Sequence, residues 1–157
     1  PSLSNFSGRN PQSPVVADGH MDFSVVVPMT GRAVTEALKV VGREFAEAGI
    51  GARLGTISSF HLRSFILISA FPTSRSDREA NRKTRVAYER AVKLTAAHGW
   101  GQYRAHAGFM DVAMSTYSFN NNVLSRFHAT LKNAVDPNGI LSAGRYGMWA
   151  GRRPQSV

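Results

Sequence analysis

The sequence contains no cysteine, which excludes disulfide bonds, thiolate metal ligands and a cysteine nucleophile. It also lacks an uninterrupted run of about 18 apolar residues, the length that a helix needs to cross a bilayer. No charged and apolar leader of the kind that directs secretion is present. We therefore predict a soluble protein with no membrane partner, and we favour the cytoplasm as its location.

Several short motifs of catalysis and nucleotide binding are missing as well. The chain has no GxSxG, no GxxxxGK[ST] and no GxGxxG, so nucleophilic hydrolysis, a P-loop and a dinucleotide fingerprint have no support. His61, His98 and His128 do not pair with another histidine or a carboxylate at the spacing of metal ligands. We predict no metal site.

Positive charge, by contrast, is in excess. The chain has 19 Lys and Arg residues against 10 Asp and Glu, a formal net charge of +9, which favours anionic partners. The basic residues are spread along the chain without a block of five or six, which is typical of a solvated basic surface. We do not expect a nucleic-acid partner, because "LRSFILISAF" lacks the glycine and aromatic pattern of RNA-recognition strands.

Periodic segments predict the secondary structure of the first hundred residues. "HMDFSVVVP", "ARLGTISSF" and "LRSFILISAF" are β-branched or apolar, as strands are. Thr30 and Ser76 are predicted helix N-caps, the second in capping-box spacing with Glu79. Residues at helical spacing predict one buried face in each of two helices. These faces are Val34, Leu38, Val41, Phe45 and Ala48 in the first helix and Ala80, Thr84, Ala87, Ala91 and Leu94 in the second.

With "GQYRAHAGF" as a further strand, the order of elements is β-α-β-β-α-β. This order predicts an α+β fold of the ferredoxin-like type, in which two helices lie on one face of an antiparallel sheet. Residues 107–157 are more loop-like and too short for an independent core, so we expect them to pack on something else.

The stretch "GWGQYRAHAGFMD" gathers three side chains that suit an anionic ligand. The phenol of Tyr103 and the guanidinium of Arg104 can both donate to a phenolate or carboxylate oxygen, and His106 follows two residues later. Neighbouring residues of a regular strand point to opposite faces, so convergence of the pair requires a bend, which the flanking glycines permit. A core tyrosine beside a surface arginine is the alternative. His20, behind Gly19, is either a structural histidine or one presented at a cleft.

Residues 99–149, from "GWGQYRAH" to "SAGRYGMW", resemble the C-terminal end of the vanillyl-alcohol oxidase and p-cresol methylhydroxylase family of FAD-dependent oxidoreductases. The resemblance needs no gap and extends in looser form to about residue 20. It implies that residues 1–99 are the later part of the substrate (cap) domain and that residues 100–157 complete the FAD-binding domain, itself absent from the chain. The start without Met agrees with this expectation.

The resemblance also implies roles for single residues. Tyr103 and Arg104 match the family's pair that binds the phenolic oxygen of a 4-substituted phenol. His20, in "GHMDFS", falls where one branch attaches FAD covalently, while His106 and Arg145 fall near the flavin.

Asp22 departs from the family pattern. It stands at a pocket-lining position where the relatives carry an aromatic or apolar side chain. A carboxylate there would repel a phenolate unless it is protonated or paired, so a more polar substrate, or one cationic at the para group, is implied.

The implied activity is oxidation of 4-substituted phenols by hydride transfer to flavin through a quinone methide. This chain alone would be inactive. We expect an FAD-binding domain in the same or a separate chain, oxygen or a cytochrome as electron acceptor, and a homo-oligomer. The alternative is a stand-alone ferredoxin-like binding or scaffold module without catalytic activity. Such a module has no need of His20, "YRAH" and "AGRYG" together, and all three are present.

Overall fold

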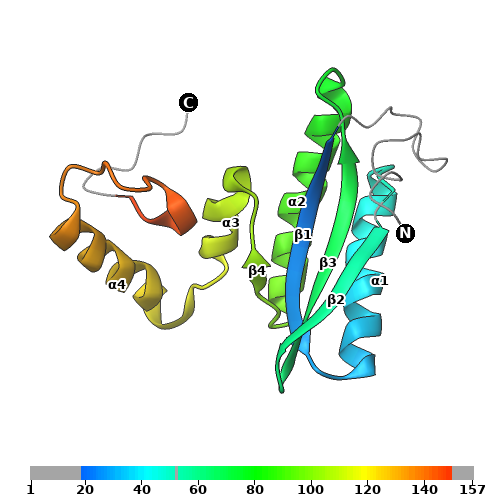
Figure 1. The fold of residues 1–157 in the computed structure, drawn as a ribbon, viewed down its shortest axis with the longest axis horizontal. Helices are drawn as coiled ribbons and strands as arrows, with labels where there is room; N and C mark the ends of the chain where they lie inside the picture. The colour runs from blue at the N-terminus through cyan, green and yellow to red at the C-terminus, as the bar shows by residue number, and fades with distance from the viewer. Residues whose placement is uncertain (1–18, 52, 150–157) are drawn as a thin grey trace. The chain divides into compact units, whose positions relative to one another are not determined.

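The computed structural model of the protein describes residues 19–51 and 53–149 (Figure 1). The chain divides between His106 and Ala107 into two compact units. None of the helices in the described ranges is both long and apolar enough to cross a membrane.

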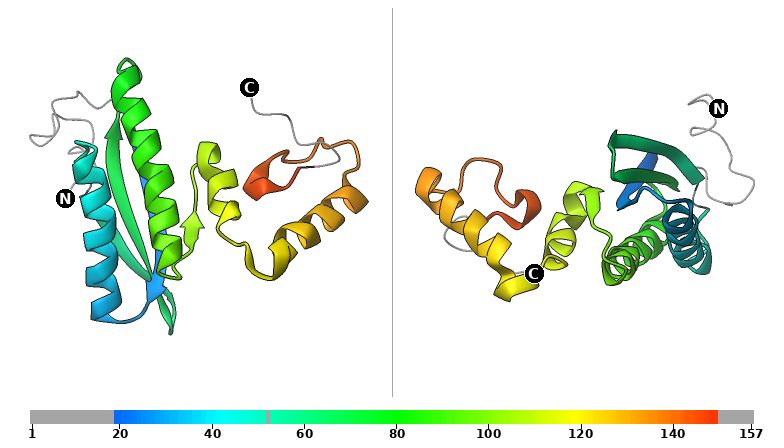
Figure 2. Two further views of the ribbon diagram at one scale, coloured as in Figure 1. Left: turned by 180° about the vertical axis from the view of Figure 1, so that it is seen from behind. Right: turned by 90° about the horizontal axis from the view of Figure 1, so that it is seen from below.

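The first unit is a four-stranded antiparallel sheet with two helices. Its strands are β1 (Gly19–Pro28), β2 (Arg53–His61), β3 (Ser64–Thr73) and β4 (Gln102–Arg104), in the order β2-β3-β1-β4. The helices α1 (Gly31–Glu47) and α2 (Arg78–Ala97) lie on the same face of this sheet (Figure 2). The predicted α+β, ferredoxin-like arrangement is therefore confirmed.

Four aromatic rings form the centre of the core between sheet and helices. Phe23 of β1 lies 6.1 Å from Phe45 of α1 and 5.0 Å from Tyr88 of α2, measured between ring centroids. Phe71 of β3 stacks on Phe45 at 4.1 Å. Because side chains alternate along a strand, the contact of Phe23 with both helices assigns the two faces of β1. Its odd-numbered residues face the helices, and its even-numbered residues face away from them.

The buried faces of the helices differ in part from the predicted ones. In α1, Val41 and Phe45 are buried as expected, but Val34 and Leu38 are only half-buried. In α2, Thr84, Ala87 and Ala91 are buried as predicted, but Leu94 is 42% exposed. The helices bury neighbouring stripes in their place, which include Ala33, Ala37 and Glu44 in α1 and Tyr88, Val92 and Thr95 in α2. Glu44 lies where the two helices meet, and its buried carboxylate is 3.0 Å from Arg90 Nε.

One predicted helix cap is right and the other is wrong. Thr30 caps α1, and its hydroxyl accepts a hydrogen bond from the Ala33 amide at 3.2 Å. The cap of α2 is Asp77, whose carboxylate accepts from the Ala80 amide at 2.8 Å, and not Ser76. The capping box does not form because the helix starts one residue later than predicted and the Glu79 carboxylate bonds to Arg82 instead.

The second unit consists of short elements. These are η2 (Ala107–Phe109), α3 (Met110–Ser115), α4 (Phe119–Val135) and η3 (Arg145–Gly147). Regular turns of α4 begin only after Asn120–Asn122, which have φ values of 45° to 55°. Six large apolar side chains of this unit are 49–76% exposed, namely Phe119, Phe127, Leu131, Val135, Ile140 and Leu141. A surface of this kind is normally covered by a partner or a further domain.

Candidate functional site

Strand β1 carries three polar side chains on the sheet face opposite α1 and α2, which we call the distal face. His20, Asp22 and Ser24 alternate with residues that point to the helices. The His20 side chain is exposed, Asp22 is half-buried and Ser24 is only 1% exposed. Ser24 is not among the predicted site residues, although its two-residue spacing from Asp22 could have identified it.

Strand β4 brings the predicted Tyr-Arg pair beside this row. Ser24 pairs with Arg104, and Val25 pairs with Gln102, so one step along β1 corresponds to two steps along β4. Tyr103 is the additional residue. A bulge of this kind bends the strand and redirects a side chain. The structure thus contains the irregularity that convergence of two adjacent side chains requires, and both Tyr103 and Arg104 are exposed.

Cross-strand register places a cation and an anion near each other on the distal face. Arg104 lies opposite Ser24, and Asp22 lies one diagonal step away, a separation of about 7–8 Å between backbone positions. Among the described residues, neither the Asp22 carboxylate nor the Arg104 guanidinium has a hydrogen bond or an ion pair. His106 is exposed two residues beyond the end of β4. The distal face therefore gathers His20, Asp22 and Arg104.

Two buried polar side chains on these strands have no hydrogen-bond partner within the described ranges. They are the Ser24 hydroxyl and the amide of Gln102. An unsatisfied buried polar group costs about 1–3 kcal/mol, and such groups usually find a partner outside the segment that carries them. Ser24 lies opposite Arg104 on the distal face, as we expect of a site completed by further atoms, whereas Gln102 lies opposite Val25, which faces the helices.

Arg145 belongs to the second unit, where it is exposed at the start of η3. The loop before it depends on Gly144, which has a φ of 78°, and a Cβ atom there would lie 2.5 Å from the Trp149 ring. Trp149 Nε1 in turn donates to Asp111 Oδ1 at 3.4 Å. The backbone that carries Arg145 is thus well defined within its unit, and the predicted place of Arg145 near a flavin stays a prediction.

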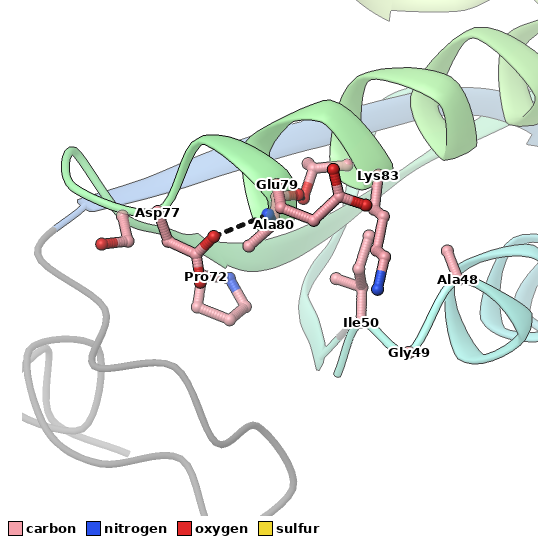
Figure 3. A pocket seen from close by; sticks show the side chains of 10 residues that line it. Ala48, Gly49, Ile50, Pro72, Asp77, Glu79, Ala80 and Lys83 are labelled. Atoms are coloured by element: carbon pink, nitrogen blue, oxygen red, sulfur yellow. Dashed lines mark hydrogen bonds between the residues drawn. The ribbon is translucent and has the colours of Figure 1, made fainter.

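A hollow of about 240 Å³ elsewhere on the first unit contains none of the predicted site residues. It lies between the end of α1 and the start of α2, where Ile50, Pro72 and Lys83 line it (Figure 3). Its acidic groups are already engaged, since Asp77 caps α2 and Glu79 bonds to Arg82. No group of three or more potential metal ligands occurs in the part of the chain that the structure describes.

Comparison with known proteins assigns the family. The model of the C-terminal domain of FAD-linked oxidases matches residues 16–146. The chain belongs to the FAD-linked oxidases. It represents their C-terminal domain, and the predicted resemblance to the vanillyl-alcohol oxidase and p-cresol methylhydroxylase family is confirmed.

Two solved structures of FAD-linked oxidases are similar to this domain. The first is 4-ethylphenol oxidase from Gulosibacter chungangensis in complex with isoeugenol, with a TM-score of 0.80, 29% identity, and coverage of 90% of this chain and 26% of the oxidase. The second is p-cresol methylhydroxylase with bound substrate, with a TM-score of 0.75, 21% identity, and coverage of 83% and 24%. The second match shows the fold alone. The chain spans about a quarter of the length of these FAD-linked oxidases.

Proposed function

We propose that this chain is the C-terminal part of an FAD-dependent oxidoreductase that oxidises 4-substituted phenols. The observation that carries the proposal is the bulge in β4, which puts Tyr103 and Arg104 beside the polar row of β1. Similarity to a 4-ethylphenol oxidase supports the substrate class. The other part of the enzyme is an FAD-binding domain in the same or a separate chain.

Three residues of this chain are proposed to contact FAD. The His20 side chain is exposed on the distal face, and it is the proposed site of a covalent bond to the cofactor. Arg145 would place a cation beside the flavin ring, and His106 would lie close to it. The unsatisfied Ser24 hydroxyl on the same face fits a surface that a cofactor or substrate covers. When bound, FAD supplies the acceptor for the two electrons of the hydride.

Tyr103 and Arg104 are the proposed catalytic residues, and their task is to stabilise the phenolate form of the substrate. A free phenol has a pKa of about 10. Donation from the Tyr103 hydroxyl and the Arg104 guanidinium to its oxygen favours the ionised form and lowers that pKa. The phenolate oxygen then pushes electron density toward the para carbon, which helps a hydride to leave. The substrate loses the phenolic proton and one hydride, and water adds to the resulting quinone methide.

The test uses this chain assembled with an FAD-binding domain and 4-ethylphenol as substrate. We expect Arg104→Ala to lower kcat/KM by about 10²–10³-fold, the usual cost of removing a donor to a developing oxyanion. The matched control is Arg82→Ala, which removes an exposed arginine paired with Glu79 on α2. An equal effect of the two substitutions, or none from Arg104→Ala, would show that the phenolic oxygen binds elsewhere.

The electron acceptor of this enzyme is proposed to be oxygen or a cytochrome. We further propose a homo-oligomer in the cytoplasm. Stopped-flow reoxidation of the reduced flavoprotein by dissolved oxygen separates the two acceptors, since an oxidase reoxidises rapidly and a cytochrome-linked dehydrogenase does not.

A further inference from the structure

The carboxylate of Asp22 is a half-buried charge without a hydrogen bond or ion pair among the described residues. Its cross-strand neighbour on β3 is Ala70, whose small side chain offers neither a charge nor a hydrogen bond. Along β1 its neighbours on the distal face are His20 and Ser24. Partial burial of an unpaired carboxylate is costly, so this position has a cation or a hydrogen-bond donor as its natural ligand.

Arg104 is another charge on the distal face that has no hydrogen bond or ion pair to a residue that the structure describes. It is diagonal to Asp22 across the β1–β4 ladder, where ion pairs often form, yet no ion pair joins the two side chains. The face thus offers an anion site and a cation site about 7–8 Å apart at the backbone. A ligand that contacts both side chains needs an anionic end for Arg104 and a cationic end for Asp22.

Resting on the proposed function, we propose that the substrate is a phenol whose para substituent carries an ammonium group, and that Asp22 binds this group. The phenolate end lies at Tyr103 and Arg104. An uncharged alkyl group would leave the Asp22 carboxylate desolvated and repelled by the phenolate, whereas an ammonium group compensates both effects. Asp22 is therefore a specificity-determining residue for 4-(aminoalkyl)phenols.

The test compares 4-(2-aminoethyl)phenol with 4-propylphenol, which have the same skeleton and differ by an ammonium group in place of a methyl group. Anaerobic reduction of the flavoprotein by each phenol gives the Kd and the rate of flavin reduction separately. We expect the amine to bind more tightly. Asp22→Asn raises the Kd of the amine by about 10- to 100-fold and lowers that of 4-propylphenol, and Asp22→Leu lowers the Kd of 4-propylphenol further.

The matched control is Glu47→Gln, which removes the same charge from the exposed surface of α1 and leaves both Kd values unchanged. If Asp22→Asn does not accumulate as folded protein, Asp22→Ser gives the same comparison with a smaller side chain. Equal Kd values for the two phenols, or an amine preference that survives loss of Asp22, would overturn this inference and leave the proposed function intact. Flavin reduction by neither phenol would overturn the proposed function itself.

Discussion

The two units of the chain bury their apolar side chains to very different extents. In the first unit, four aromatic rings from two strands and two helices are almost fully inaccessible to solvent. In the second unit, Phe127, Leu131 and Val135 follow one another along α4 at four-residue intervals and are all exposed. The first unit therefore contains its own hydrophobic core, whereas the second unit presents an apolar helix face.

Because of this difference in burial, the two units are suited to different tasks. A sheet that is rigid because its core is complete can hold side chains such as Arg104 and Asp22 in fixed positions on its distal face. A helix with an exposed apolar face is stabilised by a surface that another domain supplies. We propose that this surface belongs to the FAD-binding domain, as the predicted division of the chain requires.

The largest expected effect is on the core of the first unit. Phe23→Ala removes the ring that contacts both helices, and we expect it to lower the free energy of unfolding by about 3–5 kcal/mol. Phe127→Ala removes an equally large ring from α4 and should cost less than about 0.5 kcal/mol in this chain, because an exposed ring gains little from folding. Urea unfolding of the two variants measures both values.

The same pair of variants tests whether only the first unit has a core of its own. If Phe127→Ala destabilised this chain as strongly as Phe23→Ala, α4 would be part of a core that the second unit closes itself. Binding of this chain to an FAD-binding domain should show the reverse order. Phe127→Ala should weaken this binding more than Phe23→Ala does, as measured by calorimetric titration.

A smaller effect is expected from the loop before Arg145. Gly144→Ala adds a methyl group at a left-handed position against the Trp149 ring, at a cost of about 1–3 kcal/mol. Gly31→Ala is the matched control, because nothing lies within 4 Å of its added Cβ, and we expect it to stabilise the chain by about 0.4–1 kcal/mol. Hydrogen exchange of the η3 amides reports the first change. Unaltered exchange in Gly144→Ala would mean that this loop is not held as described.

The smallest expected effect is on the pH and salt dependence of stability, to which one carboxylate in each unit contributes. Lys132 Nζ donates to Asp136 at 2.5 Å, and the amides of Ile140 and Leu141 each donate at 2.9 Å. The hydrogen bond from Lys132, with smaller contributions from the two amides, holds the pKa of Asp136 below its ordinary value. In the first unit, the hydrogen bond from Arg82 lowers the pKa of the exposed Glu79.

Both groups stabilise the folded state above their ordinary pKa of about 4 and lose that contribution as the pH falls through the lowered value. The dependence of stability on salt distinguishes the exposed Glu79 pair from the buried Asp136 pair. At pH 7, added salt should abolish the difference between wild type and Glu79→Gln, because an exposed pair is screened. The difference between wild type and Asp136→Asn should persist, because Asp136 is 5% exposed. Equal salt sensitivity in urea unfolding would show that the Lys132–Asp136 pair is as hydrated as the surface pair.

The sequence predicts the strands and helices of the first unit well, because each has a clear period and Val41 and Phe45 lie where the period places them. It fails where two neighbouring helical stripes are both possible. The predicted face of α2 includes Leu94 and omits Tyr88, because an amphipathic pattern does not show that a tyrosine ring meets Phe23 and Phe71 from two strands. Burial of Glu44 likewise depends on Arg90, which is 46 positions away in the chain.

For the candidate site, the sequence predicts the residue types but not their arrangement. In a regular strand, the adjacent residues Tyr103 and Arg104 would point to opposite faces and could not share a ligand. Only the pairing of β4 with β1 shows the bulge at Tyr103. The roles of His20, His106 and Arg145 stay predictions, since they concern a cofactor and a second domain. Asp22 stands out in the sequence as a departure from the family, and the structure adds that the residue is half-buried and that its carboxylate has no partner within the described ranges.

The most direct test of the account asks whether flavin lies on the distal face of the first unit. This chain is assembled with an FAD-binding domain and denatured, and flavin absorbance and the mass of the peptide that contains His20 are measured. The account predicts that flavin stays attached to the wild type, that the His20 peptide carries the mass of FAD, and that His20→Ala loses the flavin. Flavin that stays attached in His20→Ala, or whose mass is found on a peptide from elsewhere, would contradict it.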